Sequence, residues 1–257
     1  MKYSIVIPTY NHCDDLLKPC VESILRYTDM NNVQLIISAN GCVDNTQWYL
    51  RQLEYQFQSL GFADNFQIAW SDAPLGYSGA CNAGIELALS DHIVLLNNDC
   101  VLLEQPRSQW LNLLHTPFVQ NPMCGVSCVI KGASDCAGHD FAVFFCVMIS
   151  RACFDRVGLL NTEYNPGGGE DTEFCIESER AGFQVVPCIE LEWVESQQCY
   201  IGEFPIYHKG EGTVHDPLLV PDWNSVVVRN SLRLAKKYNP SYLEHWISIH
   251  GTPDATI

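Results

Sequence analysis

The sequence predicts an α/β protein with a mostly parallel, doubly wound central sheet flanked by helices. Short apolar runs alternate with helical stretches through the first half of the chain, which is the pattern of successive βαβ units. The runs SIVIP at residues 4–8, QLIIS at 34–38 and HIVLLN at 92–97 are almost continuously apolar. Parallel strands buried on both faces have this composition, so the sheet is expected to be covered by helices on both sides.

The first half contains four expected strands separated by helices. The strands are expected at residues 3–7, 33–38, 66–70 and 92–96, and the helices at 14–27, 45–60 and 78–89. Pro8 is expected to end the first strand, because proline lacks the N–H that a sheet ladder uses. The fourth strand is fully apolar, so we expect it near the centre of the sheet.

The second half departs from this alternation, and we expect it to carry a smaller antiparallel portion. Its expected strands are residues 125–130, 141–149, 184–187 and 203–207, and its expected helices are 151–157, 172–180 and 222–238. A loop with three consecutive glycines lies at residues 161–169, and the tail after Pro240 shows no clear pattern. Since no linker, repeat or low-complexity segment divides the chain, the sequence predicts one domain.

The composition is that of an ordinary globular protein with a strong acidic balance. The 257 residues include 14 Lys and Arg against 30 Asp and Glu, a net charge of 14 − 30 = −16. This balance argues against nucleic acid as a partner, because phosphate binding requires a basic face. The longest apolar runs, such as residues 142–149, are too short to span a bilayer, and the first residues do not resemble a signal peptide. The thirteen cysteines contain no CxxC pair. We therefore expect reduced thiols and a cytoplasmic protein.

The acidic charge is concentrated in one segment. Residues 161–211 carry eleven acids and two bases, 2 − 11 = −9. The expected late helix carries Arg229, Arg233, Lys236 and Lys237 at spacings that share a face. We expect this basic face to be solvated, and the Arg229 side chain could reach a diphosphate.

Polar residues follow three of the expected strands. They are Thr9-Tyr10-Asn11, Asn40 with Asp44, and Asn97-Asn98-Asp99. In an open α/β sheet, ligands bind beyond the carboxyl ends of the strands, so these residues indicate one site at that edge. A carboxylate at the end of a buried strand needs a cation or donors, and a hard divalent metal suits Asp99. Helix capping is the alternative role for Asp44 and Asp99.

Two further segments could complete such a site. Small residues, Gly76 and Ser78 among them, open the third expected helix, where a helix N-terminus favours an anion and a tight turn is the alternative reading. Glu170 and Asp171 follow the glycine loop and begin an acidic helix. They suit a general base, although acids in a first turn are also ordinary partners of the helix dipole.

Four stretches in order, residues 4–12, 75–85, 93–101 and 144–185, resemble the family 2 glycosyltransferases, which are inverting enzymes with the GT-A fold. The segment YHKGEGTV at 207–214 is similar to the late histidine segment of that family. The resemblance covers roughly residues 2 to 235. It divides the expected domain into a nucleotide-sugar-binding half at about residues 1–101, an acceptor half at about 102–238, and a tail at 239–257.

The resemblance also implies roles for individual residues. Asp171 matches the catalytic base, with Glu170 the less favoured candidate, and Asp99 with His208 matches the ligands of Mg²⁺ or Mn²⁺. The sequence departs from the family pattern at two places. Ala39 and Asn40 stand in place of two leading aspartates, which leaves the nucleobase undetermined, and Asn97 stands in place of the first acid of the DxD-type metal motif. The implied donor-binding residues are Pro8, Thr9, Tyr10, Asn11, Asn40, Asp44, Gly76, Ser78, Asn82, Asn97 and Asn98.

The predicted function is therefore a metal-assisted, inverting glycosyl transfer. The donor would be a UDP, dTDP or GDP sugar, and the acceptor the hydroxyl of a glycan, a lipid-linked glycan or another molecule. Because the QxxRW motif of processive members is absent, we expect single additions. The alternatives are a catalytically degenerate nucleotide-sugar-binding protein and a nucleotidyltransferase. Residues 11–15, NHCDD, are acidic where a nucleotidyltransferase needs a basic loop, and a redox sensor is disfavoured by the absence of CxxC.

Overall fold

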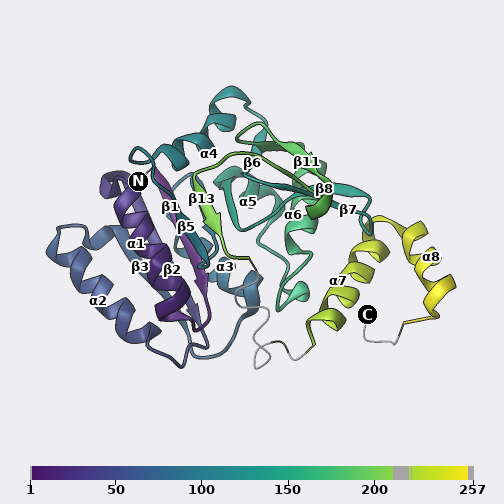
Figure 1. The fold of residues 1–257 in the computed structure, drawn as a ribbon, viewed down its shortest axis with the longest axis horizontal. Coiled ribbons are helices and arrows are strands. Elements are labelled where there is room, and N and C mark those ends of the chain that lie inside the picture. Colours follow the sequence, from purple (N-terminus) through teal and green to yellow (C-terminus); the bar gives the residue numbers. More distant parts are fainter. Residues whose placement is uncertain (1, 211–219, 221, 254–257) are drawn as a thin grey trace.

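The computed structural model describes residues 2–210, 220 and 222–253, and Figure 1 shows its fold. The first half alternates strands and helices as expected. Its elements are β1 (Tyr3–Thr9), α1 (Lys18–Tyr27, preceded by a π-helical turn at Cys13–Leu17), β2 (Val33–Asn40), α2 (Thr46–Ser59), β3 (Phe66–Ser71), α3 (Gly76–Leu87) and β4 (His92–Leu96).

The second half is built from shorter strands. Its elements are β5 (Cys100–Leu102), α4 (Gln109–Gln120), β6 (Cys124–Cys128), β7 (Lys131–Ser134), β8 (His139–Ala142), β9 (Cys146–Ser150), α5 (Arg151–Val157), α6 (Glu170–Arg180), β10 (Gln184–Pro187), β11 (Glu192–Val194), β12 (Cys199–Ile201), β13 (Ile206–His208), α7 (Trp223–Tyr238) and α8 (Pro240–His250).

Among the described residues, seven strands form the main sheet in the order β10-β6-β9-β4-β1-β2-β3. Neighbours are parallel except around β9, which pairs antiparallel with both β4 and β6. The apolar strand β4 lies at the centre, as predicted. A smaller antiparallel sheet, β11-β12-β7-β8, and the pair β13-β5 complete the expected acceptor-side portion. The predicted fold class is confirmed.

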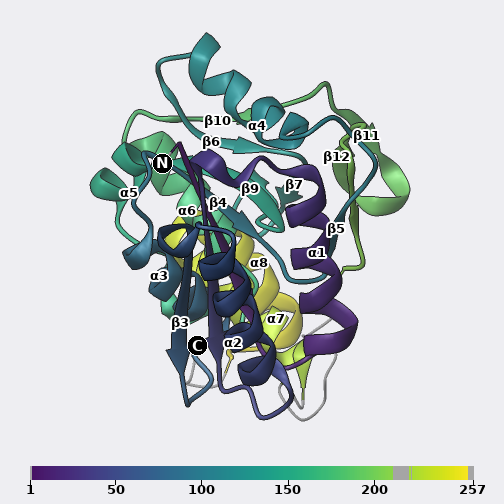
Figure 2. The same ribbon diagram turned by 90° about the vertical axis from the view of Figure 1, so that its left-hand side faces the viewer.

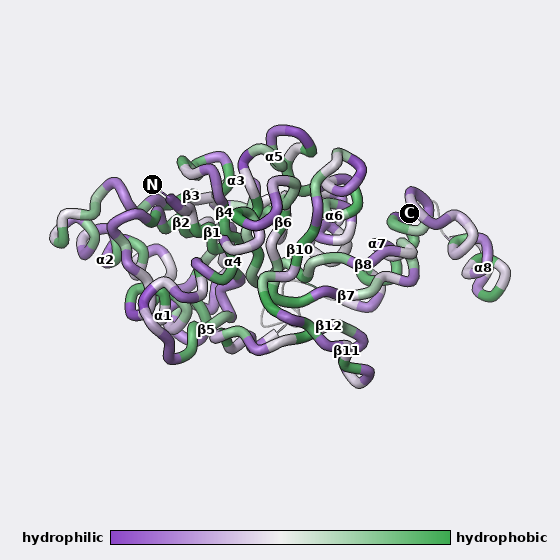
Figure 3. Tube along the Cα trace, turned by 90° about the horizontal axis from the view of Figure 1, so that it is seen from above, coloured by the Kyte–Doolittle hydropathy of each residue, from purple (hydrophilic) through white to green (hydrophobic). Residues whose placement is uncertain are grey.

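Helices cover both faces of the main sheet, and the alternation of β1 explains how. Ile5 and Ile7 belong to the core beneath α1, α2 and α4, whereas Val6 belongs to the core beneath α3, α5 and α6. Successive side chains of a strand point to opposite faces, so one short apolar run supplies both cores. Figure 2 shows α1 and α3 on either side of the first strands, and Figure 3 shows hydrophobic residues gathered along the strands.

Two sequence expectations about strand ends are corrected. Pro8 does not end β1, which continues to Thr9. β1 pairs with β4 only over Tyr3–Val6, so Pro8 lies where the strand has a paired neighbour on one side only, and the missing donor is tolerated there. The expected strand at 141–149 is two strands in different sheets, β8 and β9, separated by a turn at residues 143–145. The apolar run is unbroken, so its pattern could not indicate the turn.

The late basic helix is not merely solvated. α7 packs beside α6 and the glycine loop (Figure 1), and Lys237 Nζ lies 2.9 Å from Glu173 Oε1 and 3.4 Å from Glu177 Oε1. Arg233 donates to the Glu163 carbonyl. The basic face of α7 thus offsets part of the acidic charge of residues 161–180. The tail that showed no sequence pattern forms α8, which packs against α7.

Candidate active site

The carboxyl ends of β1, β2 and β4 meet at one edge of the main sheet. Asn98 Nδ2 donates to Thr9 Oγ1 at 2.9 Å, and Asn40 Nδ2 donates to the Thr9 carbonyl at 2.8 Å. Pro8 is buried in β1 just before this contact, and Tyr10 is half-buried just after it. The structure therefore brings together the strand-end residues that the sequence selected.

Two loops, residues 10–13 and 42–46, flank this edge. Asn11 Oδ1 accepts from the Val43 N–H at 2.8 Å. Asp44 accepts from the Cys13 N–H at 2.9 Å and from both the N–H and the hydroxyl of Thr46, at 3.1 and 2.6 Å. Burial would raise the pKa of Asp44, but these hydrogen bonds outweigh it and leave the pKa below its ordinary value. Asp44 fixes the loops and supports the first turn of α2.

The start of α3 closes against the same edge. The Leu75 N–H donates to Asn40 Oδ1 at 2.9 Å, so Asn40 connects β1, β2 and α3. Gly76 has φ +67°, and a Cβ there would lie 2.5 Å from the Asn165 side chain, so only glycine fits this approach. Ser78 is buried one turn into the helix. The helix N-terminus therefore faces the strand ends with small residues.

Asn82 serves a structural contact in this arrangement. Its Nδ2 donates to the Leu160 carbonyl at 2.8 Å, and its Oδ1 accepts from the Leu160 N–H at 3.0 Å. These two bonds tie α3 to the connection between α5 and α6. The remaining capacity of the amide is one hydrogen and one lone pair.

A cluster of possible metal ligands lies at the end of β4. The ligand atoms of Asp99, Cys100 and His208 all lie within 4.8 Å of one another. β13 pairs with β5 so that His208 is opposite Cys100, which places His208 Nε2 3.2 Å from Asp99 Oδ1. The pairing of these two short strands was not predicted, but it explains how residues more than a hundred positions apart meet.

The donor set at this cluster fits a divalent cation that also binds phosphate oxygens. A carboxylate oxygen and an imidazole nitrogen are ligands for such a cation. Burial, together with the thiols of Cys20 and Cys146 nearby, raises the pKa of Cys100 well above its ordinary value. Cys100 is therefore a neutral thiol when no ion is bound, and its soft sulfur is a poor match for Mg²⁺ or Mn²⁺, which prefer oxygen ligands. Asp99 and His208 are the fitting pair.

The two acids predicted as general-base candidates begin α6. Asp171 Oδ1 accepts from the N–H of Thr172 at 2.7 Å and from its hydroxyl at 3.4 Å. Glu170 is 6% exposed, and within the described part of the chain its Oε2 has no hydrogen-bond partner. Burial raises the pKa of both carboxyl groups, and the charge of Asp171 raises that of Glu170 further. Because Asp171 is the better hydrogen-bonded of the two, it ionises first and Glu170 keeps its proton.

Two consecutive residues, Phe144 and Phe145, connect this acid pair to the metal-ligand cluster. The Phe144 carbonyl accepts from Tyr77 of α3, while the Phe144 ring packs edge-on against Phe174 of α6 with centroids 5.9 Å apart. The Phe145 carbonyl accepts from the Asn97 N–H at 2.8 Å, and its ring stacks on His208 with centroids 4.4 Å apart. The start of α3, the acid pair and the end of β4 are therefore neighbours in space.

Three residues selected from the sequence carry buried polar atoms that no described residue satisfies. They are Ser78 Oγ, Asn97 Oδ1 and Glu170 Oε2. Most buried polar groups in proteins have a partner, so each exception calls for an explanation. A polar ligand bound between β4, α3 and α6 would supply it.

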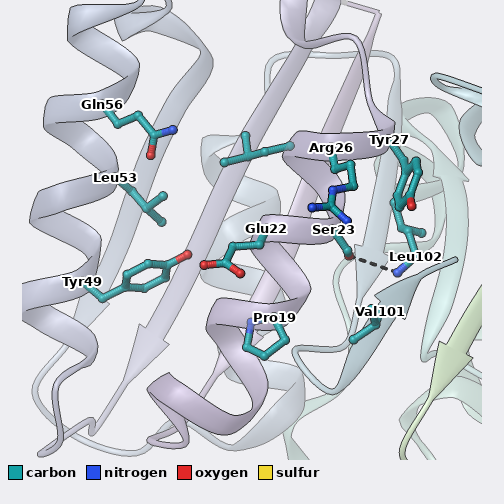
Figure 4. A pocket seen from close by; sticks show the side chains of 11 residues that line it. Pro19, Glu22, Ser23, Arg26, Tyr27, Tyr49, Leu53, Gln56, Val101 and Leu102 are labelled. Atoms are coloured by element: carbon teal, nitrogen blue, oxygen red, sulfur yellow. Dashed lines mark hydrogen bonds between the residues drawn. The ribbon is translucent and has the colours of Figure 1, made fainter. Parts of the chain in front are cut away.

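A separate pocket of about 520 Å³ lies between α1, α2 and β5 (Figure 4). Tyr49 of α2 points toward Glu22 of α1 across it, and Ser23 accepts from the Leu102 N–H at 3.0 Å. None of the site residues predicted from the sequence lines this pocket. It is therefore distinct from the strand-end site.

The chain belongs to the glycosyl transferase family 2, since the sequence model of that family matches residues 4–153. It is similar to protein y4gI of Sinorhizobium fredii, with 28% identity over 235 residues that cover 75% of this chain and 24% of that protein. The chain thus spans about a quarter of that relative's length.

Solved structures show the same fold. The mannosyltransferase PcManGT from Pyrobaculum calidifontis, in complex with GDP-Man and Mn²⁺, has a TM-score of 0.58 at 12% identity and covers 98% of this chain and 76% of that chain. GalNAc-T7 with UDP, GalNAc and Mn²⁺ has a TM-score of 0.66 at 14% identity, covering 98% and 52%. S. aureus TarS 1-349 has a TM-score of 0.54 at 12% identity, covering 79% and 60%. The resemblance to family 2 glycosyltransferases is confirmed by the family model, and these structures show that the fold is the GT-A fold.

The family segment that contains His208 is described only in part, because residues 211–214 lie outside the described residues. Across the described residues, no helix is both long and apolar enough to cross a membrane. The cytoplasmic location, the domain division and the individual site roles stay predictions.

Proposed function

We propose that the protein transfers one sugar at a time from a nucleotide-diphosphate sugar to an acceptor hydroxyl, with inversion at the anomeric carbon. The observation that carries this proposal is the Phe144-Phe145 pair. The Phe144 ring contacts α6, the helix that begins with Glu170 and Asp171, and Phe145 contacts Asn97 and His208. A candidate base near a candidate metal site is the arrangement that glycosyl transfer requires.

The donor would lie across the ends of β1, β2 and β4. Thr9, Asn11 and Asn40 would face the nucleoside. Asn97 Oδ1 and Ser78 Oγ, which have no hydrogen-bond partner among the described residues, would face the diphosphate and sugar. The proposal also includes the other strand-end residues, Pro8, Tyr10, Asp44 and Asn98, as residues that help to bind the donor. Asn40 can both donate and accept, so it is compatible with several nucleobases.

Asp99 and His208 would hold Mn²⁺ or Mg²⁺ against the donor diphosphate. When bound, such an ion offsets the negative charge that develops on the leaving nucleotide. The protein's own contribution is to keep one carboxylate and one imidazole at the end of β4, with Cys100 remaining a neutral thiol beside them.

Asp171 would act as the general base. Its carboxylate takes the proton of the acceptor hydroxyl as that oxygen forms its bond to the anomeric carbon, and the bond from that carbon to the nucleotide oxygen breaks on the opposite face. Burial raises the pKa of Asp171 and brings it closer to neutral pH, which suits a base, while the N–H and hydroxyl of Thr172 donate to it and keep it the more acidic member of the pair. Glu170 would remain protonated and could donate a hydrogen bond to a hydroxyl of either substrate.

A two-part experiment tests the proposed function. A thermal-shift screen of UDP, GDP and dTDP sugars, each with and without Mn²⁺, should show one donor class that stabilises the protein more strongly with the metal. With that donor, NMR of the product should then show the anomeric configuration opposite to that of the donor. Retention of configuration, or metal-independent binding of all donors, would contradict the proposal.

A catalytically degenerate nucleotide-sugar-binding protein is the second candidate. The observation that favours it is the internal use of Asn40, Asp44 and Asn82, whose side chains satisfy backbone groups of the chain itself. Hydrolysis of the donor by wild-type protein, absent in an Asp171→Asn variant, would exclude this candidate.

A further inference from the structure

The last part of the glycine loop, residues 164–169, joins the start of α3 to the acid pair. Asn165 Nδ2 donates to the Leu75 carbonyl at 2.6 Å, and the Pro166 carbonyl accepts from the Tyr77 N–H at 2.9 Å. The loop ends at Gly169, and α6 begins at the next residue. Any displacement of this loop therefore moves the acid pair relative to α3.

Two consecutive residues of α7 hold the loop by its carbonyl groups. Asn230 Nδ2 donates to the carbonyls of Tyr164 and Gly167 at 2.8 and 3.0 Å. Arg229 Nη2 donates to the Asn165 carbonyl at 2.6 Å, and Arg229 Nε donates to Asn230 Oδ1 at 3.1 Å. The bond from Arg229 fixes which way the Asn230 amide points, so both amide hydrogens face the two carbonyls.

The packing around this contact leaves little room for movement. Asn230 is 2% exposed, so it contacts the loop and not a substrate. Gly169 has φ +112°, and a Cβ there would lie 2.7 Å from the Tyr164 ring, so the last residue before α6 is closely packed. The two carbonyls that Asn230 satisfies lie on either side of Asn165 and Pro166, which contact α3.

We propose that Asn230, oriented by Arg229, is a positioning residue that holds the glycine loop and thereby the acid pair against α3 in the geometry that glycosyl transfer needs. This inference rests on the proposed function and extends it by giving α7 a role in positioning the acid pair. Asn230 acts through the loop and touches neither substrate nor reacting atoms. Its contribution should therefore appear in turnover and in the titration of the base, and not in nucleotide affinity.

Removing the amide has two expected consequences. The two buried carbonyls lose their donor, so the loop shifts to find other partners, and a misplacement of about 1 Å at reacting groups can lower turnover by about 10²-fold. A looser loop also admits water to the acid pair. Since burial raises the pKa of Asp171, hydration should lower it, and the acidic limb of the rate profile should move to lower pH.

The experiment compares Asn230→Leu, which keeps a similar shape without donors, with Arg229→Lys, which removes the guanidinium and with it the Nε donor to Asn230 and the Nη2 donor to the Asn165 carbonyl. Arg233→Ala is the matched control, because Arg233 lies on the same helix and also donates to a carbonyl, that of Glu163, which lies before residues 164–169. For each variant, kcat, KM for donor and acceptor, donor affinity by calorimetry, the melting temperature and the pH dependence of kcat are measured.

We expect Asn230→Leu to lower kcat by about 10²-fold, to shift the acidic limb downward and to keep donor affinity. Arg229→Lys should do the same to a smaller extent, and Arg233→Ala should retain the wild-type kcat. A folded Asn230→Leu protein with wild-type kcat and acidic limb would overturn the inference, as would a lower melting temperature alone. If Asn230→Leu does not fold, wild-type kcat and acidic limb in Arg229→Lys overturn it. Full activity of Asp171→Asn would instead refute the proposed function.

Discussion

Asp99 and Asp171 are carboxylates on opposite sides of the Phe144-Phe145 pair, and their neighbours differ in kind. Asp99 has an imidazole nitrogen 3.2 Å away and lies at the end of a buried parallel strand. Asp171 has a second acid beside it and lies at the start of a helix. A basic partner suits a carboxylate that must stay anionic as a ligand. A neighbouring acid and partial burial suit a carboxylate that must exchange a proton. The comparison shows how environment can assign different roles to the same chemical group.

The largest expected effect comes from removing the base. Asp171→Asn should lower kcat by about 10²–10⁴-fold, because it removes general base assistance, and it should leave donor binding nearly intact. Steady-state kinetics and donor calorimetry measure the two quantities. The control is Glu170→Gln, which should lose less activity, because Glu170 is the protonated member of the pair. Equal losses of kcat in the two variants would contradict the assignment of Asp171, and not Glu170, as the base.

A smaller effect is expected from the second metal ligand. His208→Ala should weaken Mn²⁺-dependent donor binding by about tenfold or more, which corresponds to roughly 1.4 kcal/mol. Cys100→Ser is the matched control, since Cys100 is the third member of the cluster but remains a thiol. Calorimetric titration with Mn²⁺ measures both variants. If Cys100→Ser weakened binding as much as His208→Ala, the assignment of the ligand pair would be wrong.

The smallest expected effect is on stability. Burial raises the pKa of Glu170 in the folded state above its unfolded value of about 4.3, so the folded state holds this proton more tightly. The resulting stabilisation is present below the unfolded pKa and is lost as the pH rises through the folded pKa. Glu170→Gln should therefore raise the melting temperature relative to wild type at pH 8 and lose this advantage at pH 4. A difference that does not change with pH would contradict the burial argument.

Much of the first half could be predicted from the sequence, because its strands are continuous apolar runs between polar strand ends. The strand at His92–Leu96 and the helix at Arg151–Val157 have the predicted bounds. The turn at residues 143–145 could not be predicted, because Phe144 and Phe145 are as apolar as the strands beside them. Pairs of short strands, such as β5 with β13, depend on contacts between segments far apart in the sequence, so no local sequence pattern predicts them.

The site was predicted as a set of residues, but not as a set of contacts. The sequence indicated the strand ends and the acid pair, and the structure places them around one sheet edge. The sequence did not indicate that Asn82 would bond to Leu160, or that Phe144 would contact both Tyr77 of α3 and Phe174 of α6. The basic face of α7 was expected to be solvated, because the spacing of its charges does not reveal the acidic segment packed against it.

The central claim is that Asp99 holds a metal for donor binding while Asp171 acts on the acceptor. The most direct test measures donor affinity with and without Mn²⁺ for wild type, Asp99→Asn and Asp171→Asn. We predict that Asp99→Asn abolishes the metal-dependent part of the affinity and that Asp171→Asn preserves it despite losing turnover. Metal-dependent affinity that survives in Asp99→Asn, or disappears in Asp171→Asn, would contradict the account.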